Sequence, residues 1–101
     1  MIEDAVNRIY YSVFYAAKAM LNSLGYDTKT RTGLISGFGL RIVKARKEDK
    51  RLGVVLRKAF ELRESADYHL AVTIDREEVE QLMRDAKYFL KEAKKFVSMN
   101  F

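Results

Sequence analysis

The sequence predicts an all-α protein, an antiparallel up-and-down four-helix bundle that forms a single domain over residues 1–101. The chain has no proline and only five glycines, so few residues oppose helix formation. Apolar residues recur at steps of three and four along four segments, which is the spacing of one helix face. With 49% hydrophobic and 33% charged residues, the composition is that of a globular domain with one core.

The first helix is expected from about Ile2 to Leu24. Gly25 is suited to end it, because glycine readily adopts the left-handed conformation found just after a helix. The main apolar stripe of this helix comprises Ile2, Val6, Ile9, Val13, Ala16, Met20 and Leu24.

Four aromatic residues of the first helix fall within six positions: Tyr10, Tyr11, Phe14 and Tyr15. At about 100° per residue, Tyr11 and Tyr15 share a stripe with Arg8, whereas Tyr10 and Phe14 lie on a different one. A helix with aromatic side chains on more than one side must be buried on more than one side. One side is therefore expected to face the bundle, and the other a second subunit, a ligand or a second packing layer.

Two middle helices are expected over about residues 32–45 and 51–70, with a turn in the charged run between them. The earlier of the two carries Gly33, Gly37 and Gly39, which weaken a helix or allow close approach to its backbone.

The last helix is expected to begin after Asp75, which forms a capping-box pattern with Glu78. Its apolar residues then continue at helical spacing to the end of the chain: Val79, Leu82, Met83, Ala86, Phe89, Leu90, Ala93, Phe96 and Val97.

The composition also excludes several kinds of site. The chain has no cysteine, so disulfides, thiolate metal sites and a cysteine nucleophile are excluded. No carboxylates have metal-ligand spacing and no glycine-rich phosphate loop occurs, so neither a metal nor a cofactor is expected. No membrane span or signal peptide is visible, which predicts a cytoplasmic protein without membrane association.

The net charge of +5 is unevenly distributed. Residues 29–63 carry eleven Lys and Arg against three acidic residues, a balance of +8, which leaves −3 for the rest. Such a field suits an anionic partner such as RNA, and the alternative is an ordinary solvated surface. The candidate phosphate-tracking residues are Arg41, Lys44, Arg46, Lys47, Lys50 and Arg51. No aromatic residue lies among them, so any binding there is expected to tolerate different sequences.

Four motifs follow one another along residues 7–68: N-R-x-Y-Y-x-x-F-Y-A-A, T-K-T-x-T-G, F-G and L-R-E-x-A-D-Y. In this order they resemble the HEPN domain superfamily, and within it the small stand-alone proteins with a Y-Y-A-x-F signature. The resemblance implies a helical bundle that dimerises and associates with nucleotidyltransferase-type antitoxins. In active members of the family it implies a metal-independent ribonuclease.

The chain departs from this family pattern at two places. Family members usually carry a further helix before the first motif, so either the true start lies upstream or dimerisation covers apolar surface that this helix would otherwise bury. Arg31 stands where relatives often have a histidine, so a role carried by that histidine is in doubt here.

The family's ribonuclease signature is an arginine followed, four to six residues on, by a histidine, and Arg63 and His69 fit it. The implied chemistry is proton removal from a ribose 2′-hydroxyl by the imidazole while the guanidinium holds the phosphate, giving a 2′,3′-cyclic phosphate. Six helical positions leave two side chains about 120° apart and about 9 Å along the axis. The two residues therefore converge only if the helix breaks near Tyr68 or the site crosses a dimer axis. The alternative is that His69 is a surface histidine at the end of a helix.

Two further groups are candidates for contact with RNA or a nucleotide. Asp67 lies four residues after Arg63 and could orient its guanidinium toward a phosphate, or form an ion pair that only orders the helix. Arg8, Tyr11 and Tyr15 could stack on a base, or form core and dimer interface.

The leading hypothesis is a HEPN-type homodimer that acts on or binds RNA as the toxin-like half of a pair with a nucleotidyltransferase. Whether it is an enzyme, namely a metal-independent endoribonuclease, is left open. The second hypothesis is a non-catalytic HEPN module that binds a nucleotide or a nucleotidyltransferase partner through its aromatic helix face. The third is a purely structural helical dimer, whose basic patch should show no salt-dependent affinity for RNA.

Overall fold

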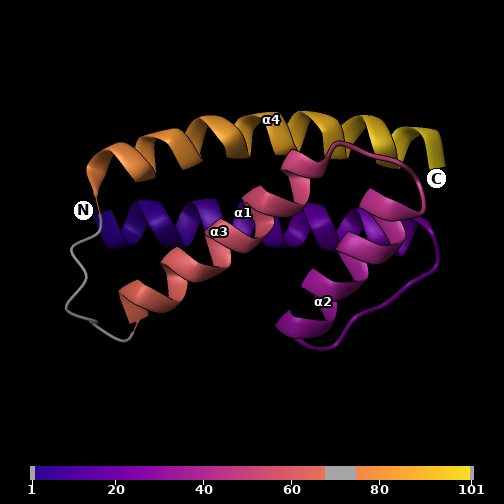
Figure 1. Cartoon of the computed structure of the whole chain (residues 1–101), viewed down its shortest axis with the longest axis horizontal. Coiled ribbons are helices and arrows are strands. Elements are labelled where there is room, and N and C mark those ends of the chain that lie inside the picture. The colour runs from indigo at the N-terminus through magenta and orange to yellow at the C-terminus, as the bar shows by residue number, and fades with distance from the viewer. Residues whose placement is uncertain (1, 68–74, 101) are drawn as a thin grey trace.

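The computed structural model describes residues 2–67 and 75–100, and nearly all of this part of the chain is helical (Figure 1). Its elements are α1 (Ile2–Ser23), α2 (Arg31–Phe38), the π-helical segment η1 (Gly39–Lys44), α3 (Lys50–Asp67) and α4 (Arg76–Asn100). The predicted all-helical bundle is confirmed, and no strand occurs within the described ranges.

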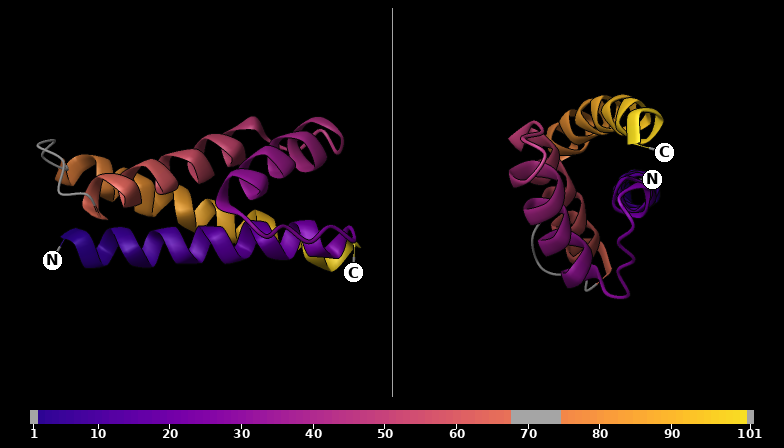
Figure 2. Two further views of the ribbon diagram at one scale, coloured as in Figure 1. Left: turned by 90° about the horizontal axis from the view of Figure 1, so that it is seen from below. Right: turned by 90° about the vertical axis from the view of Figure 1, so that its right-hand side faces the viewer.

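The helices form two layers (Figures 1 and 2). α1 and α4 lie side by side along the long axis and run in the same direction, while α2 with η1 and α3 form an inclined layer across them. The expected alternation of direction holds from α2 to α4. α1 and α2 instead point toward the same end of the molecule, because the connection over residues 24–30 returns along the bundle before α2 begins.

Buried residues of α1 fall on two stripes: Val6, Ile9, Val13 and Met20 on the first, and Tyr10, Ala17 and Leu21 on the second. α1 packs most extensively against α4, next against α3, and also against α2. These two stripes are adjacent and form one broad buried face. The other stripe, with Tyr11 and Tyr15, is exposed in this chain, so its burial by a second subunit or a ligand stays a prediction.

The centre of the core contains a stacked aromatic pair. Phe38 of α2 and Phe89 of α4 have ring centroids 5.5 Å apart and planes inclined by 27°. Both side chains are fully buried, so the pair joins the two layers.

The end of α1 is set by Gly25, as predicted. Gly25 has a φ of +90°, which a residue with a side chain rarely adopts. Its N–H donates to the carbonyl of Asn22 (2.9 Å), and the N–H of Tyr26 donates to that of Leu21 (3.0 Å). These two bonds form a Schellman motif and satisfy carbonyls that have no partner within the helix.

Polar side chains cap the other helices at their start. Thr30 Oγ1 accepts a hydrogen bond from the N–H of Gly33 at the beginning of α2. Asp49 accepts from a backbone N–H at the start of α3, and Asp75 accepts from the N–H of Glu77 at the start of α4. Such caps occupy N–H groups that lack partners in the first helical turn.

α2 and η1 form one continuous helix over residues 31–44, close to the predicted 32–45. At its end the N–H of Ala45 donates to the carbonyl of Leu40, five residues back, which is the π-helical pattern (3.1 Å).

Candidate functional site

Arg63 of α3 lies against the aromatic motif of α1. The central carbon of its guanidinium is 4.9 Å from the ring centroid of Tyr10 and 4.7 Å from that of Tyr11. The side chain is half-buried. These distances are typical of cation–π contacts, so the fold places the charge of Arg63 on the first motif of the sequence.

Arg31, at the start of α2, approaches the same aromatic group. Its guanidinium carbon is 5.6 Å from the ring centroid of Tyr10 and 5.8 Å from that of Phe60. Arg31 and Arg63 therefore both flank Tyr10. Burial raises the pKa of the Tyr10 hydroxyl, and the two nearby arginines oppose that rise in part. The hydroxyl is accordingly protonated at neutral pH.

Tyr11 and Tyr15 form an exposed aromatic surface beside Arg63. Their ring centroids are 6.1 Å apart with planes inclined by 20°. Tyr11 is 43% exposed and Tyr15 is 61% exposed, so both residues keep surface that is accessible to solvent. We call Tyr10, Tyr11, Tyr15, Arg31 and Arg63 the arginine–tyrosine cluster.

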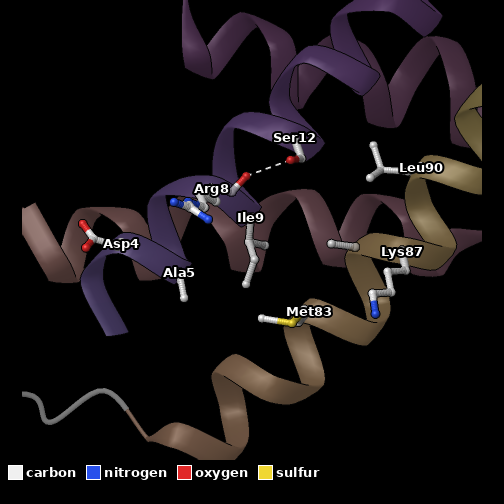
Figure 3. Close-up of a pocket in the computed structure, with 9 residues that line it drawn as sticks. Asp4, Ala5, Arg8, Ile9, Ser12, Met83, Lys87 and Leu90 are labelled. Carbon is white, nitrogen blue, oxygen red and sulfur yellow. Dashed lines mark hydrogen bonds between the residues drawn. The ribbon is translucent and has the colours of Figure 1, made fainter. Parts of the chain in front are cut away.

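Arg8 lies on α1 three residues before Tyr11, on the stripe that the sequence predicts. It borders a groove between α1 and α4, together with Ile9, Ser12, Met83 and Lys87 (Figure 3). The guanidinium that lies over Tyr11 is that of Arg63, from another helix.

Two predicted site residues cannot be placed by side chain. His69 lies outside the described residues. Asp67 is the last residue of α3, and its side chain also lies outside the described part. The pairing of Arg63 with His69, and that of Arg63 with Asp67, therefore stay predictions.

The basic residues Arg41, Lys44, Arg46 and Lys47 are all exposed on η1 and the turn after it. Arg41 lies over the ring of Tyr26, with 4.2 Å between guanidinium carbon and centroid, and its Nη1 donates to the tyrosine hydroxyl (2.9 Å). The fold thus adds an aromatic residue to a surface that has none in sequence. This surface lies before the start of α3, whereas Arg63 lies near its end, so the two regions are separate.

Sequence reasoning missed a polar cluster between the start of α3 and α4. The Asp49 carboxylate accepts hydrogen bonds from Arg51 Nε (2.8 Å) and from the Tyr88 hydroxyl (2.7 Å), and the Arg51 guanidinium lies 4.7 Å from the Tyr88 ring centroid. Hydrogen bonds from Arg51 and Tyr88 hold the pKa of the Asp49 carboxyl well below its usual range. Asp49 and Arg51 are two residues apart, so a contact between them could be expected from the sequence. Tyr88 is 39 residues from Asp49, and no sequence pattern connects it to the pair. The arrangement is that of a structural link between two helices.

Arg31 was also missed as a site residue. It drew notice in the sequence only as a replacement in the T-K-T-x-T-G loop, and no spacing rule connects that loop to Tyr10. Its place beside Arg63 depends on how α2 packs across α1.

The described residues offer neither a metal site nor a membrane span. No group of three or more His, Asp or Glu in residues 2–67 and 75–100 could hold a metal ion. Within the same ranges no helix is both long and apolar enough to cross a bilayer.

Comparison with known proteins identifies relatives over most of the chain. A sequence model of the HEPN domain matches residues 1–96. The protein named "Putative toxin MJ0142" from Methanocaldococcus jannaschii is 34% identical over 93 residues, which cover 92% of this chain and 63% of that protein.

Two further relatives are similarly close. A UPF0332 protein from Thermotoga maritima is 34% identical over 96 residues, covering 95% of this chain and 73% of its own length. "Putative toxin MJ0605" from Methanocaldococcus jannaschii is 35% identical, covering 94% and 70%. The chain thus spans between 63% and 73% of the length of these three relatives.

Proposed function

The chain belongs to the HEPN domain family, and from this membership and the surroundings of Arg63 we propose that it is a toxin-like protein that acts on RNA. The names of the two Methanocaldococcus relatives support the toxin-like part of this proposal. The net charge of +5 favours an anionic partner. We further propose that it acts in the cytoplasm as a homodimer.

The observation that carries the proposal is the position of Arg63 beside Tyr11. A guanidinium can hold a phosphate through two parallel hydrogen bonds, and an exposed tyrosine ring can stack on a base. Tyr11 contacts both Arg63 and Tyr15, so we expect a base that stacks on the tyrosines to have its phosphate within reach of the guanidinium. Arg31 supplies a second positive charge near Tyr10.

If the protein is active, His69 and Arg63 carry out the cleavage that the family signature implies. The imidazole of His69 takes the proton of the ribose 2′-hydroxyl, and the 2′-oxygen attacks the adjacent phosphorus. Arg63 holds the phosphate oxygens as negative charge develops. The bond to the 5′-oxygen breaks, the imidazolium returns a proton to that oxygen, and a 2′,3′-cyclic phosphate remains. A homodimer can bring a second copy of these residues to the same RNA.

Cleavage of single-stranded RNA in EDTA tests this proposal. Arg63→Ala is expected to lower the rate about 100-fold or more, because it removes a group that stabilises charge in the transition state. His69→Ala is expected to have a comparable effect. Arg57→Ala is the matched control, since Arg57 is an exposed arginine of the same helix outside the arginine–tyrosine cluster.

Circular dichroism should show that each variant keeps the helical content of the wild type. Products should carry 2′,3′-cyclic phosphate ends. If Arg63→Ala and His69→Ala both cleave as fast as wild type, the catalytic proposal is wrong.

The exposure of Tyr11 and Tyr15 favours a second candidate, a non-catalytic module that binds a nucleotide or a nucleotidyltransferase-type antitoxin through this face. It predicts no turnover of RNA. Binding of AMP or of a co-expressed nucleotidyltransferase should then weaken in Tyr15→Ala and not in Arg57→Ala. Equal binding by both variants would argue against this candidate.

A further inference from the structure

A groove runs between α1 and α4, and its lining residues differ from those of the arginine–tyrosine cluster. Its volume is about 470 Å³, and its apolar lining includes Ala5 and Ile9 of α1 and Met83 and Leu90 of α4. Figure 3 shows Ala5 and Ile9 directed toward α4, and Met83 and Leu90 directed back toward α1. Met83 is 41% exposed and Leu90 40% exposed, so both keep apolar surface in contact with solvent.

The groove continues along the same two helices. A second hollow of about 330 Å³ shares Leu90 with the first, and its α1 side is formed by Ala16 and Ala19. Besides the charged residues Asp4 and Arg8, the α1 residues that line the two hollows are Ala5, Ile9, Ser12, Ala16 and Ala19. Most of these side chains are small, and they recur at steps of four, three, four and three. This is the spacing of a seam that receives another helix, and it extends about 21 Å along α1.

The charged residues along the groove are mostly basic. Arg8, Lys87 and Lys94 line it, against one carboxylate from Asp4. In the part of the chain that the structure describes, none of these three cations takes part in an ion pair. A second copy of this chain laid in the groove through its own groove would bring like charges together, which disfavours that occupant.

We propose that this groove binds an amphipathic helix with acidic flanks from a protein partner. The apolar face of such a helix would cover Met83, Leu90 and Ala16, and its carboxylates would neutralise Lys87 and Lys94. No residue of the arginine–tyrosine cluster lines the groove. The proposal therefore goes beyond action on RNA and does not depend on it.

A display library of helical peptides, randomised on one face and its flanks and selected on the whole chain, tests this proposal. Selected peptides should carry apolar residues at i, i+3 or i+4 and i+7, flanked by Asp or Glu. Leu90→Glu should weaken their binding at least about tenfold, because it places a negative charge in the apolar contact.

Leu40→Glu is the matched control, since Leu40 is an exposed leucine, 52% accessible, on η1. It should bind the peptides as wild type does. The double variant with Lys87→Glu and Lys94→Glu should also bind weakly, and rising salt should weaken binding by the wild type. Circular dichroism establishes whether each variant is folded. Lys87 and Lys94 are both exposed, so the double lysine variant tests the groove even if Leu90→Glu does not fold.

The proposal would be overturned if the selection enriched no peptide, or enriched neutral or basic peptides. Equal binding of the selected peptides to Leu90→Glu and Leu40→Glu would also contradict it. So would sedimentation that shows a homodimer which Leu90→Glu dissociates and Leu40→Glu does not. The last result would assign the groove to a contact between copies of this chain.

Discussion

Two stacked aromatic pairs of this protein have similar geometry and opposite surroundings. Phe38 and Phe89 lie 5.5 Å apart at 27°, and Tyr11 and Tyr15 lie 6.1 Å apart at 20°. The phenylalanines are fully buried, whereas the tyrosines are 43% and 61% exposed. Ring geometry alone therefore does not separate a core contact from a surface that could receive a ligand.

The difference in burial determines whether each pair contributes to the stability of the fold or to the binding of a ligand. Burial of a phenylalanine ring stabilises the fold through the loss of water-accessible apolar area and through close packing. An exposed tyrosine pair has already lost some conformational freedom by stacking, but a large part of its surface still meets water. That surface stabilises the protein little and is available for a base.

Phe89→Ala should have the largest effect of the variants considered. Loss of the ring leaves a cavity beside Phe38 and is expected to lower the free energy of unfolding by about 3–5 kcal/mol. Tyr15→Ala should lower it by less than about 1 kcal/mol, because the ring is mostly exposed. Urea denaturation of both variants measures the difference, and equal losses would contradict the comparison.

Tyr15→Ala should instead affect RNA binding. Stacking of a base on an aromatic ring contributes about 1–3 kcal/mol, so affinity for a short single-stranded RNA should fall by about 5- to 150-fold. Fluorescence anisotropy with labelled RNA measures it. Tyr15→Phe is the control, since it keeps the ring and should retain the affinity. A loss of affinity in Tyr15→Phe as large as that in Tyr15→Ala would show that stacking is not the cause.

The ring of Tyr88 is intermediate between these two pairs in its exposure. It is half-buried, and its hydroxyl donates a hydrogen bond to Asp49. Asp49→Ala removes the N-cap of α3 and is expected to cost about 1 kcal/mol. Asp49→Asn keeps a capping side chain but not the charge.

The same carboxylate predicts a pH dependence. Its pKa is lower in the folded protein than the ordinary value of about 3.9. The resulting stabilisation is fully present above about pH 5 and is lost as the pH falls through about 4 toward the folded pKa. Unfolding of wild type and Asp49→Asn, measured from pH 6 to pH 2, should therefore differ most at pH 6 and converge in acid. A constant difference would mean that the charge of Asp49 does not stabilise the fold.

Tyr88→Phe should have the smallest effect. It keeps the ring under Arg51 and removes only the hydroxyl that donates to Asp49. Its loss of thermal stability, measured by circular dichroism, should be smaller than that of Asp49→Ala. A larger loss would mean that the Tyr88 hydroxyl, and not the capping of α3 by Asp49, provides most of the stabilisation at this contact.

The positions of the helices could be predicted from the sequence because the residues that begin and end a helix act on neighbouring backbone groups. Gly25 ends α1 through its own backbone conformation, and Asp75 caps α4 through an N–H two residues away. The main buried stripe of α1, which includes Ile9 and Val13, followed from helical spacing. The direction of α2 did not follow, because the path of residues 24–30 depends on contacts made by the finished bundle.

The candidate site was predicted less completely. Arg63 and Tyr11 were both named from the sequence, but as members of separate groups, and only packing of α3 on α1 brings them together. Arg8 was grouped with the tyrosines by its position on the helix, but a helical wheel cannot show that it also borders a groove beside α4. Arg31 could be recognised only through its distance to Tyr10.

The most extensive packing in the molecule joins its first helix to its last, since α1 lies against α4 over much of its length. During synthesis, α1 to α3 must therefore leave the ribosome before the residues that complete their core have been added. The buried face of α1, including Ile9 and Val13, stays without its main cover until α4 emerges. Folding of the domain is thus delayed until α4 has been synthesised, and a nascent chain that stops before α4 has no complete core.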